Sequence, residues 1–373
     1  MKRIISLILV TILSVSALFC LAGCGKVNDA EVSIIWSEGD WKNGEGKATI
    51  PNSLINSMDR AMYIKKVDYK HYGANGNAET QVELAKKAIE NGCQVLVVEM
   101  ILDITDLFQA KAQEIVNAAK AENVPLIFFN CTVADSIVNS YDKCYIVKSD
   151  IENVADIQGK LIADYVKSNF KKLDKNTDGV LSYIGTGVIS AAAVKKANEL
   201  LATKDYIVKT EKKEKINTKI ELTTEIDLLK SELIVTESDE LAYATLLELQ
   251  AKDYNTDKLS THFIPVFTIG ENVDYKAMVV SMGKDKYEEN KYLVDLTSVK
   301  EEDLEAMIYT TINVIDAGRI AGTATEDRDS IALAVAQIVR NICKGNDATK
   351  DVASDSVVVD GNIVKVSYIP YTK

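Results

Sequence analysis

Continuous apolar runs alternate with amphipathic stretches along most of this chain. The apolar run VSIIW at Val32–Trp36 is followed by a helix-period segment at Thr80–Gly92 and then by the apolar run CQVLVVE at Cys93–Glu99. An uninterrupted apolar run is typical of a strand in a parallel sheet that is buried on both faces. Further helices and strands of the same kind are predicted within Ala112–Asn130, Ile157–Phe170, Gly179–Gly185, Glu232–Glu237 and Pro265–Gly270. The alternation predicts α/β layers with right-handed crossovers, in which ligands bind beyond the carboxyl ends of the strands.

The first 24 residues carry a secretion pattern. Lys2 and Arg3 precede an apolar stretch, and the small residues of LAGC end at Cys24. This arrangement is a lipobox, so residues 1–23 are predicted to be a lipoprotein signal peptide and Cys24 the lipidated first residue, followed by a linker over 24–30. An ordinary signal peptide or a membrane-spanning anchor is the alternative, although about 18 apolar residues are short for a span. The expected location is the extracytoplasmic face of the cell membrane.

Length and composition bound the remainder of the chain. A mature length of about 350 residues exceeds what one core usually supports, which favours two domains. The net charge of −12 and the lack of a long basic patch argue against a nucleic-acid partner and favour a small neutral or cationic ligand. No nucleophile and base form a recognisable catalytic motif, and the glycines form no dinucleotide fingerprint, so neither an enzyme nor a nucleotide cofactor is expected.

The segment DKNTDGVLS has the spacing of a calcium loop. Asp174, Asn176 and Asp178 occupy alternate positions, Val180 offers a backbone carbonyl at the seventh position, and Ser182 stands at the ninth. The twelfth position is Gly185, so the loop itself lacks the usual bidentate glutamate. The alternative is an Asp/Asn/Gly-rich turn between a helix and a strand, where these residues are common.

Four segments together resemble the bacterial galactose/glucose-binding protein family of type I periplasmic solute-binding proteins. They are VPLIFFN, NSYDKCYIV, IQGKLIADYVKSN and LDKNTDG, and a weaker likeness extends through SELIVTESDELA, IPVFTIG and VDGNIVKVSYIPY. The resemblance implies an α/β fold of two Rossmann-like lobes joined by three crossovers, closing on a ligand like a hinged clamp. It implies an N-terminal lobe over 31–148 and 297–356, and a C-terminal lobe over 149–296 and 357–373.

The resemblance also implies a structural calcium ion and a set of ligand contacts. In the family a glutamate that begins a later strand completes the calcium site, and Glu232 occupies the matching place. Asn130 matches the asparagine that ends the family's FFN strand and contacts the sugar. The family's histidine, aspartate and arginine contacts fall within Gly187–Ala197, where this chain has none of the three. Candidate ligand contacts are Asp40, Trp41, Asn130, Ser238, Asp239 and Asp295.

The function predicted from these residues is a membrane-anchored solute-binding lipoprotein of a sugar-type ABC transporter. Each buried hydroxyl left unpaired costs about 1–3 kcal/mol, so the loss of three contacts predicts a carbohydrate-like ligand other than galactose or glucose. The expected partners are that small molecule, an ABC permease or membrane sensor, and the membrane through the lipid anchor. The alternative is a degenerate scaffold that serves as a sensory or protein-interaction lipoprotein. A DNA-binding repressor with the same lobes is excluded by the export signal.

Overall fold

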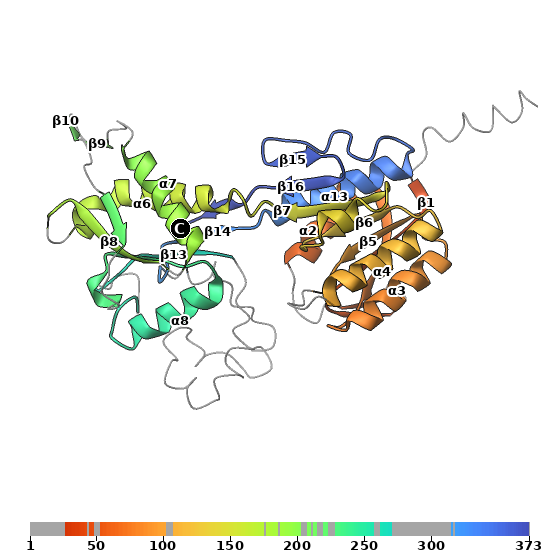
Figure 1. The fold of residues 1–373 in the computed structure, drawn as a ribbon, viewed down its shortest axis with the longest axis horizontal. Coiled ribbons are helices and arrows are strands. Elements are labelled where there is room, and N and C mark those ends of the chain that lie inside the picture. The colour runs from red at the N-terminus through yellow and green to blue at the C-terminus, as the bar shows by residue number, and fades with distance from the viewer. Residues whose placement is uncertain are drawn as a thin grey trace, which may run out of the picture. The chain divides into compact units, whose positions relative to one another are not determined.

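The computed structural model describes most of the chain between Val27 and Thr372 (Figure 1). The described residues are 27–42, 45–47, 53–101, 107–174, 177–185, 187–202, 207–209, 212–214, 219–222, 228–256, 262–270, 315 and 318–372. Cys24, Asn176 and Asp295 lie outside these ranges, and for Asp40 and Trp41 only the backbone lies within them. Within these ranges no helix combines the length and the apolar character needed to cross a membrane.

The chain divides into two compact units. The first comprises Met1–Val147, Ala332–Ser354 and Val359–Val364, and the second comprises Lys148–Ile331, Asp355–Val358 and Lys365–Lys373. Strand β15 spans the boundary at Val358 but is paired within the sheet of the first unit. When β15 is assigned to the first unit, the chain crosses between the units three times, at 147/148, 331/332 and 364/365. The predicted fold class has three such crossovers.

The first unit is built on a seven-stranded sheet with the order β15-β16-β7-β6-β5-β1-β4. The pairs β4/β1, β1/β5, β5/β6 and β6/β7 are parallel, so the carboxyl ends of these five strands lie at one edge. Their bounds are β1 Val27–Trp36, β4 Val67–Gly73, β5 Val95–Glu99, β6 Leu126–Phe129, β7 Cys144–Ser149, β15 Val357–Asp360 and β16 Ile363–Val366. The apolar runs predicted to be strands at Val32–Trp36 and Cys93–Glu99 lie within or around β1 and β5.

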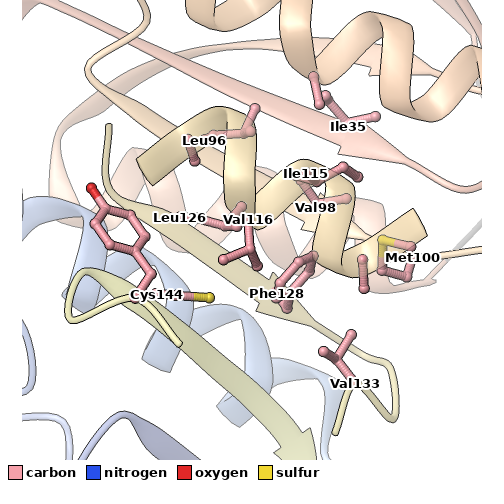
Figure 2. Packing of buried hydrophobic residues seen from close by; sticks show 14 of the residues in the cluster. Ile35, Leu96, Val98, Met100, Ile115, Val116, Leu126, Phe128, Val133 and Cys144 are labelled. Atoms are coloured by element: carbon pink, nitrogen blue, oxygen red, sulfur yellow. The ribbon is translucent and has the colours of Figure 1, made fainter. Parts of the chain in front are cut away.

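Helices cover both faces of this sheet (Figure 1). They are α2 Ser53–Lys65, α3 Ala78–Glu90, α4 Leu107–Ala121, α5 Asp135–Val138 and α13 Arg328–Cys343. Figure 2 shows Ile115 and Val116 of α4 among Leu126 and Phe128 of β6, and all four side chains are fully buried. Burying one such side chain contributes about 1.5–3 kcal/mol, so this apolar layer fixes where α4 lies on the sheet.

The second unit has a six-stranded sheet with the order β11-β8-β12-β13-β14-β17. All pairs are parallel except β14/β17. The bounds are β8 Val180–Gly185, β11 Lys219–Leu222, β12 Leu233–Val235, β13 Val266–Ile269, β14 Gly322–Thr325 and β17 Ile369–Tyr371. Two small antiparallel pairs, one in each unit, are β2 Asp40–Lys42 with β3 Glu45–Lys47, and β9 Ile207–Lys209 with β10 Lys212–Glu214.

The helices described in the second unit are α6, α7 and α8, with a short 3₁₀ turn, η2. Their bounds are α6 Val154–Leu173, α7 Val188–Ala202, α8 Asp239–Gln250 and η2 Leu228–Lys230. Helices α6 and α7 approach closely at Gly159, because a Cβ atom there would lie 2.5 Å from the Ala193 carbonyl oxygen. The glycine therefore permits the close packing of the two helices.

The structure differs from the predicted lobe boundaries near the end of the chain. The prediction assigned 297–356 to the N-terminal lobe, but β14 pairs with β13 in the second sheet, and the chain returns to the first unit at Ala332. The prediction also assigned 357–373 to the C-terminal lobe, whereas β15 and β16 complete the first sheet. In both places the hydrogen bonds between strands determine to which unit the segment belongs. The predicted boundaries were taken from the resemblance and did not include this pairing.

Candidate functional site

Polar residues gather at the carboxyl edge of the first sheet, where β1, β5 and β6 end. Ser37 follows β1, Glu99 is the last residue of β5, and Asn130 follows β6. The Ser37 hydroxyl donates to Glu99 Oε2 at 2.9 Å, and the Asn130 amide nitrogen donates to Glu99 Oε1 at 2.8 Å. The Ser37 backbone N–H lies 3.4 Å from the same Oε2. Glu99 is 6% exposed, so these donors compensate a buried carboxylate. The three residues are called the Glu99 cluster below.

Backbone geometry holds the Glu99 cluster in place. Gln81 of α3 is fully buried, and its side chain donates to the Glu99 carbonyl oxygen at 2.7 Å and accepts from the Ile101 N–H at 3.1 Å. Gln81 thereby replaces the strand partners that β5 loses where it ends. Asn130 has φ of +50°, a left-handed conformation that asparagine tolerates better than most residues. The strand end and the bend after β6 are therefore both fixed.

Behind the Glu99 cluster lies a chain of hydrogen bonds that starts at Trp36. The Trp36 indole donates from Nε1 to His71 Nδ1 at 2.8 Å, and His71 Nε2 lies 3.0 Å from Asp59 Oδ1. Because an indole N–H only donates, Nδ1 is the acceptor and Nε2 carries the proton that His71 donates to Asp59. Tyr69 also donates to Asp59 Oδ1, at 2.7 Å. The chain fixes the orientation of the tryptophan that precedes Ser37.

The ionisation of Asp59 and Tyr69 follows from this chain. Burial acts to raise the pKa of Asp59, but the hydrogen bonds from His71 and Tyr69 outweigh burial, and the pKa falls below its ordinary value. Burial, together with the neighbouring Asp59, raises the pKa of Tyr69. Asp59 is therefore a carboxylate and Tyr69 a neutral phenol at neutral pH.

The carboxyl edge of the second sheet has a different construction, in which Glu237 occupies the N-terminus of α7. Ser190 donates its backbone N–H to Glu237 Oε1 at 2.9 Å. The first N–H groups of a helix have no partner within the helix, and the helix dipole favours an anion there. A Cβ atom at Gly187 would lie 2.6 Å from Glu237 Oε2, so only glycine leaves room for this carboxylate. The carboxylate of Glu237 therefore occupies the place at the N-terminus of α7 where an anion would otherwise bind.

Ser238 and Asp239, both predicted as ligand contacts, lie at the start of α8. The Ser238 hydroxyl accepts from the Leu241 N–H at 3.4 Å, which makes it the N-cap of the helix. Asp239 is 5% exposed. Gly270 has φ of +115°, and a Cβ atom there would lie 2.5 Å from Asp239 Oδ2. The absence of a side chain at Gly270 therefore provides space for Asp239.

The strand that precedes the return to the first unit is β14, and Glu326 follows it. Ser149 donates its hydroxyl to Glu326 Oε1 at 2.7 Å. The prediction placed this crossover near Asp295, but the return lies at 331/332. Glu326 is therefore the acidic residue that follows β14, while Asp295, predicted as a ligand contact, lies outside the described residues.

The predicted calcium loop joins α6 to β8, and its described residues form two bonded groups. Asp174 is the C-cap of α6 and accepts from the Gly179 N–H through Oδ2 at 3.0 Å, while Asp178 accepts from the Val180 N–H at 2.7 Å. On the neighbouring strands, the Ser182 N–H donates to Glu232 Oε2 at 2.9 Å. The structure thus brings Ser182 and Glu232 together, as the resemblance implied.

Asp174 has a further property that bears on a cation. The residue is 7% exposed, and its Oδ1 is buried and has no hydrogen-bond partner in the described part of the chain. A buried acceptor without a donor is unfavourable, and a hard cation satisfies such an oxygen. Within the described residues, no group of three or more histidine, cysteine, aspartate and glutamate side chains is arranged to hold a metal ion. Asn176, predicted as a ligand, lies outside those residues.

The sequence analysis missed Ser37, Glu99 and Glu237. A signal for Glu99 was present, because VLVVE ends on a carboxylate just as LIFFN ends on an amide, and parallel strands end at one edge. Glu237 had a weaker signal, since its partner at the N-terminus of α7 lies 47 residues away in the sequence. Two side chains that come together only because their strands are neighbours in the sheet leave no pattern in the sequence around either residue.

Comparison with models of protein families finds no match. The chain is 37% identical over 75 residues to the D-galactose/methyl-galactoside binding periplasmic protein MglB of Haemophilus influenzae. The matched segment spans 20% of this chain and 22% of that protein. The resemblance to this sugar-binding family is confirmed there, at the level of a divergent relative.

Solved structures match over nearly the whole length. An ABC transporter, LacI family transcriptional regulator from Brachyspira murdochii has a TM-score of 0.50 and 12% identity, covering 92% of this chain and 95% of that chain. A glucose-bound ABC transporter solute-binding protein from Clostridium phytofermentans has a TM-score of 0.46 and 16% identity, covering 91% and 92%. The fold class is that of a type I periplasmic binding protein, as predicted.

Proposed function

We propose that this chain is the extracytoplasmic solute-binding component of a sugar-type ABC importer. The observation that carries the proposal is the Glu99 cluster, a set of three hydrogen-bonded polar residues at the carboxyl ends of three parallel strands. Open α/β sheets bind their ligands at that edge. The local likeness to MglB supports the same class of function. The fold is one that binds and releases a solute, so the proposal assigns no catalytic residue.

The ligand is a small carbohydrate-like molecule other than galactose or glucose. Within Gly187–Ala197 the chain has no histidine, aspartate or arginine, and in the structure this segment begins α7, whose N-terminus Glu237 occupies. Asn130 donates its amide to Glu99. Three of the contacts that the resemblance assigns to the sugar are therefore absent, and Asn130 gives one of its two amide hydrogens to Glu99. Proposed contact residues are Asp40, Trp41, Asn130, Ser238, Asp239 and Asp295, and we add Glu99 because it is hydrogen-bonded to Asn130.

We also propose a lipid anchor at Cys24 that holds the protein on the extracytoplasmic face of the cell membrane, next to a permease or a membrane sensor. The support is the lipobox alone. Replacing Cys24 with serine removes the acylated thiol. The variant is expected to leave the membrane fraction after cell fractionation, and its retention there argues for an uncleaved apolar span.

A structural calcium ion is proposed for the loop between α6 and β8. Asp174, Asn176, Asp178, Val180, Ser182 and Glu232 supply oxygen donors, and the orphan Oδ1 of Asp174 supports the assignment. Bound calcium would tie the end of α6 to the start of β12. Saturation 100-fold above the dissociation constant adds about 2.7 kcal/mol to the stability, so calcium is expected to raise the melting temperature over that in chelator. Asp174→Ala is expected to abolish the rise, and Asp164→Asn, an exposed change on the same helix, to retain it.

Ligand-dependent thermal unfolding tests the main proposal. The lipidated protein in detergent micelles is scanned against pentoses, hexoses, polyols and their amino-substituted counterparts, each with calcium and with chelator. A ligand of the proposed class is expected to raise the melting temperature in a concentration-dependent way. A panel that leaves the melting temperature unchanged, while calcium still raises it, contradicts solute binding.

One observation favours a second candidate, a scaffold that serves as a sensory or protein-interaction lipoprotein. Both carboxyl edges are partly filled by the chain itself, through Glu99 in the first unit and Glu237 in the second. A protein of this class binds its partner without a small solute. It predicts no thermal shift with any small molecule and an unchanged complex with its membrane partner in Glu99→Gln.

A further inference from the structure

The last turn of α2 exposes two large apolar side chains beside two lysines. Tyr63 is 84% exposed and Ile64 is 61% exposed, although Met62, just before them, is fully buried. Lys65 ends the helix, and Lys66 follows it with an exposed side chain. Single exposed apolar residues are common on protein surfaces, but here two of them adjoin each other and a pair of basic residues. Residues Tyr63, Ile64, Lys65 and Lys66 are called the Tyr63 patch below.

A tight turn fixes the place of the Tyr63 patch on the first sheet. Lys66 has φ of +58°, and its N–H donates to the Tyr63 carbonyl oxygen at 3.1 Å. Strand β4 begins at the next residue, Val67. Helix α2 therefore ends directly at the amino end of β4, and the patch lies at the amino edge of the sheet. The Glu99 cluster lies at the opposite, carboxyl edge.

The same edge is the one nearest to the proposed lipidation site. Val27 begins β1, and its Cα partner in the neighbouring strand is Val67, the residue that follows the Tyr63 patch. Adjacent strands lie about 4.8 Å apart. Three residue steps separate Val27 from Cys24, and a chain spans at most about 3.6 Å per residue, so these two residues are at most about 11 Å apart. A lipid on Cys24 therefore keeps the amino edge of the first sheet close to the bilayer.

The charge around the Tyr63 patch is opposite to that of the whole chain. The net charge of the chain is −12, but the stretch from Arg60 to Asp68 holds three basic residues and one acidic residue. Basic side chains close to a bilayer are attracted by anionic headgroups. A tyrosine suits the headgroup level, because its ring is apolar and its hydroxyl is polar, and an isoleucine beside it can enter the acyl boundary. The patch thus matches an anionic lipid surface in charge and in polarity.

We propose that the Tyr63 patch docks the first unit onto the surface of the membrane that carries the lipid anchor. This docking rests on the proposed anchor at Cys24 and goes beyond it. A lipid at the end of a three-residue segment limits the distance from the membrane, but it does not set the orientation of the protein. A second contact at the amino edge does set it. The carboxyl edge of the first sheet, where a solute is proposed to bind, then points away from the bilayer.

Quenching of tryptophan by brominated lipids tests the docking with the full-length lipidated protein. Tyr63→Trp is reconstituted into vesicles of phosphatidylcholine and phosphatidylglycerol that carry brominated acyl chains. The control is Leu107→Trp, because Leu107 is 49% exposed and begins α4 at the opposite edge of the same sheet. The emission of Tyr63→Trp is expected to be quenched and shifted to shorter wavelength. Leu107→Trp is expected to be quenched no more than the native protein with its own two tryptophans.

Removing the charges of the patch tests its electrostatic part. In the Tyr63→Trp protein, the double change Lys65→Gln and Lys66→Gln is expected to weaken docking about fivefold for each charge removed. High salt is expected to weaken docking as well, since it screens exposed charges. The matched control is Lys171→Gln with Lys172→Gln, which removes two adjacent exposed charges from the end of α6 and is expected to leave the quenching unchanged.

The outcomes separate the docking from the lipid anchor. A protein that floats with the vesicles, with Tyr63→Trp quenched no more than Leu107→Trp, overturns the docking and leaves the anchor intact. Failure of the native protein to float with the vesicles overturns both. A shift of the emission without quenching assigns the patch to a second copy of the chain, and equal losses in the two lysine pairs assign the effect to overall charge. Either result overturns the docking.

Discussion

The two units present carboxylates at the same kind of sheet edge, but they hold them in different ways. In the first unit Glu99 is held by side chains that follow neighbouring strands, Ser37 and Asn130. In the second unit Glu237 is held by the backbone of α7, and two glycines, Gly187 and Gly270, make room for the carboxylates of Glu237 and Asp239. One edge depends on which side chains are present, and the other depends on side chains being absent.

The largest effect is expected from filling a glycine gap in the second unit. Gly270→Ala places a Cβ atom against Asp239 in a backbone with φ of +115°. Overpacking costs about 1–3 kcal/mol and a left-handed residue about 1–2 kcal/mol, so a loss of roughly 2–4 kcal/mol is expected in denaturant unfolding. Gly92→Ala, with φ of +82° and open space around it, is the control for backbone strain alone. Equal losses in the two variants would refute the proposed contact with Asp239.

Removing the carboxylate of the first unit is expected to have the next largest effect. Glu99→Ala leaves the donors of Ser37 and Asn130 without their acceptor in a buried place. An unsatisfied buried group costs about 1–3 kcal/mol, and a loss of about 2–3 kcal/mol is expected in urea unfolding. Glu99→Gln retains an acceptor and is expected to lose less. If alanine and glutamine at this position are equally stable, the hydrogen bonds of the Glu99 cluster contribute little.

A smaller effect is expected at the corresponding carboxylate of the second unit. Glu237→Ala exposes the N-terminus of α7 to water, which replaces the carboxylate as acceptor because Glu237 is only half-buried. Helix caps and charge–dipole contacts are worth about 0.5–2 kcal/mol, and about 1 kcal/mol is expected here. Glu248→Gln, at an exposed site in α8, is the control variant because it removes one negative charge away from the N-terminus of α7. A loss that exceeds that of Glu99→Ala would reverse the comparison between the units.

The smallest effect concerns Asp59 and depends on pH. The folded-state pKa of Asp59 lies below its ordinary value of 3.8, so the group contributes stability above that pH, and the contribution is lost as pH falls through the lower folded value. Asp59→Asn is therefore expected to be less stable than the native protein at pH 7 and to approach it below about pH 4. Thermal scans between pH 2 and 7 measure the difference, and a gap that stays constant across this range contradicts the assignment.

The sequence revealed the strands that consist of apolar runs and missed those that do not. Val32–Trp36 and Cys93–Glu99 were recognised because valine and isoleucine fill strands buried on both faces. Strand β14 reads Gly-Thr-Ala-Thr, is buried along its length and has no apolar run. No strand was predicted there, and the lobe boundary taken from the resemblance fell at 296/297, whereas the chain returns to the first unit at Ala332. A strand of small residues is specified by its neighbours in the sheet, and these come from distant parts of the chain.

The candidate site shows the same limit. Asn130 was predictable because it follows an apolar strand and matches the family in kind. Its orientation was not, since the orientation depends on Glu99, which lies 31 residues earlier in the chain. The resemblance assigned Ser182 and Glu232 to one site, and in the structure they are hydrogen-bonded although they are 50 residues apart in the sequence. Pairing across strands needs the sheet order, which periodicity alone does not provide.

The chain has two tryptophans: Trp36 is the last residue of β1, and Trp41 lies in β2, five residues further along. Trp36 is 1% exposed, its indole is hydrogen-bonded to His71, and the next residue bonds to Glu99. Indole emission of this protein therefore arises entirely within six residues of the sheet edge at which a solute is proposed to bind. Binding can be followed by the protein's own fluorescence, without any label, and His71→Gln is expected to shift the emission of the unliganded protein.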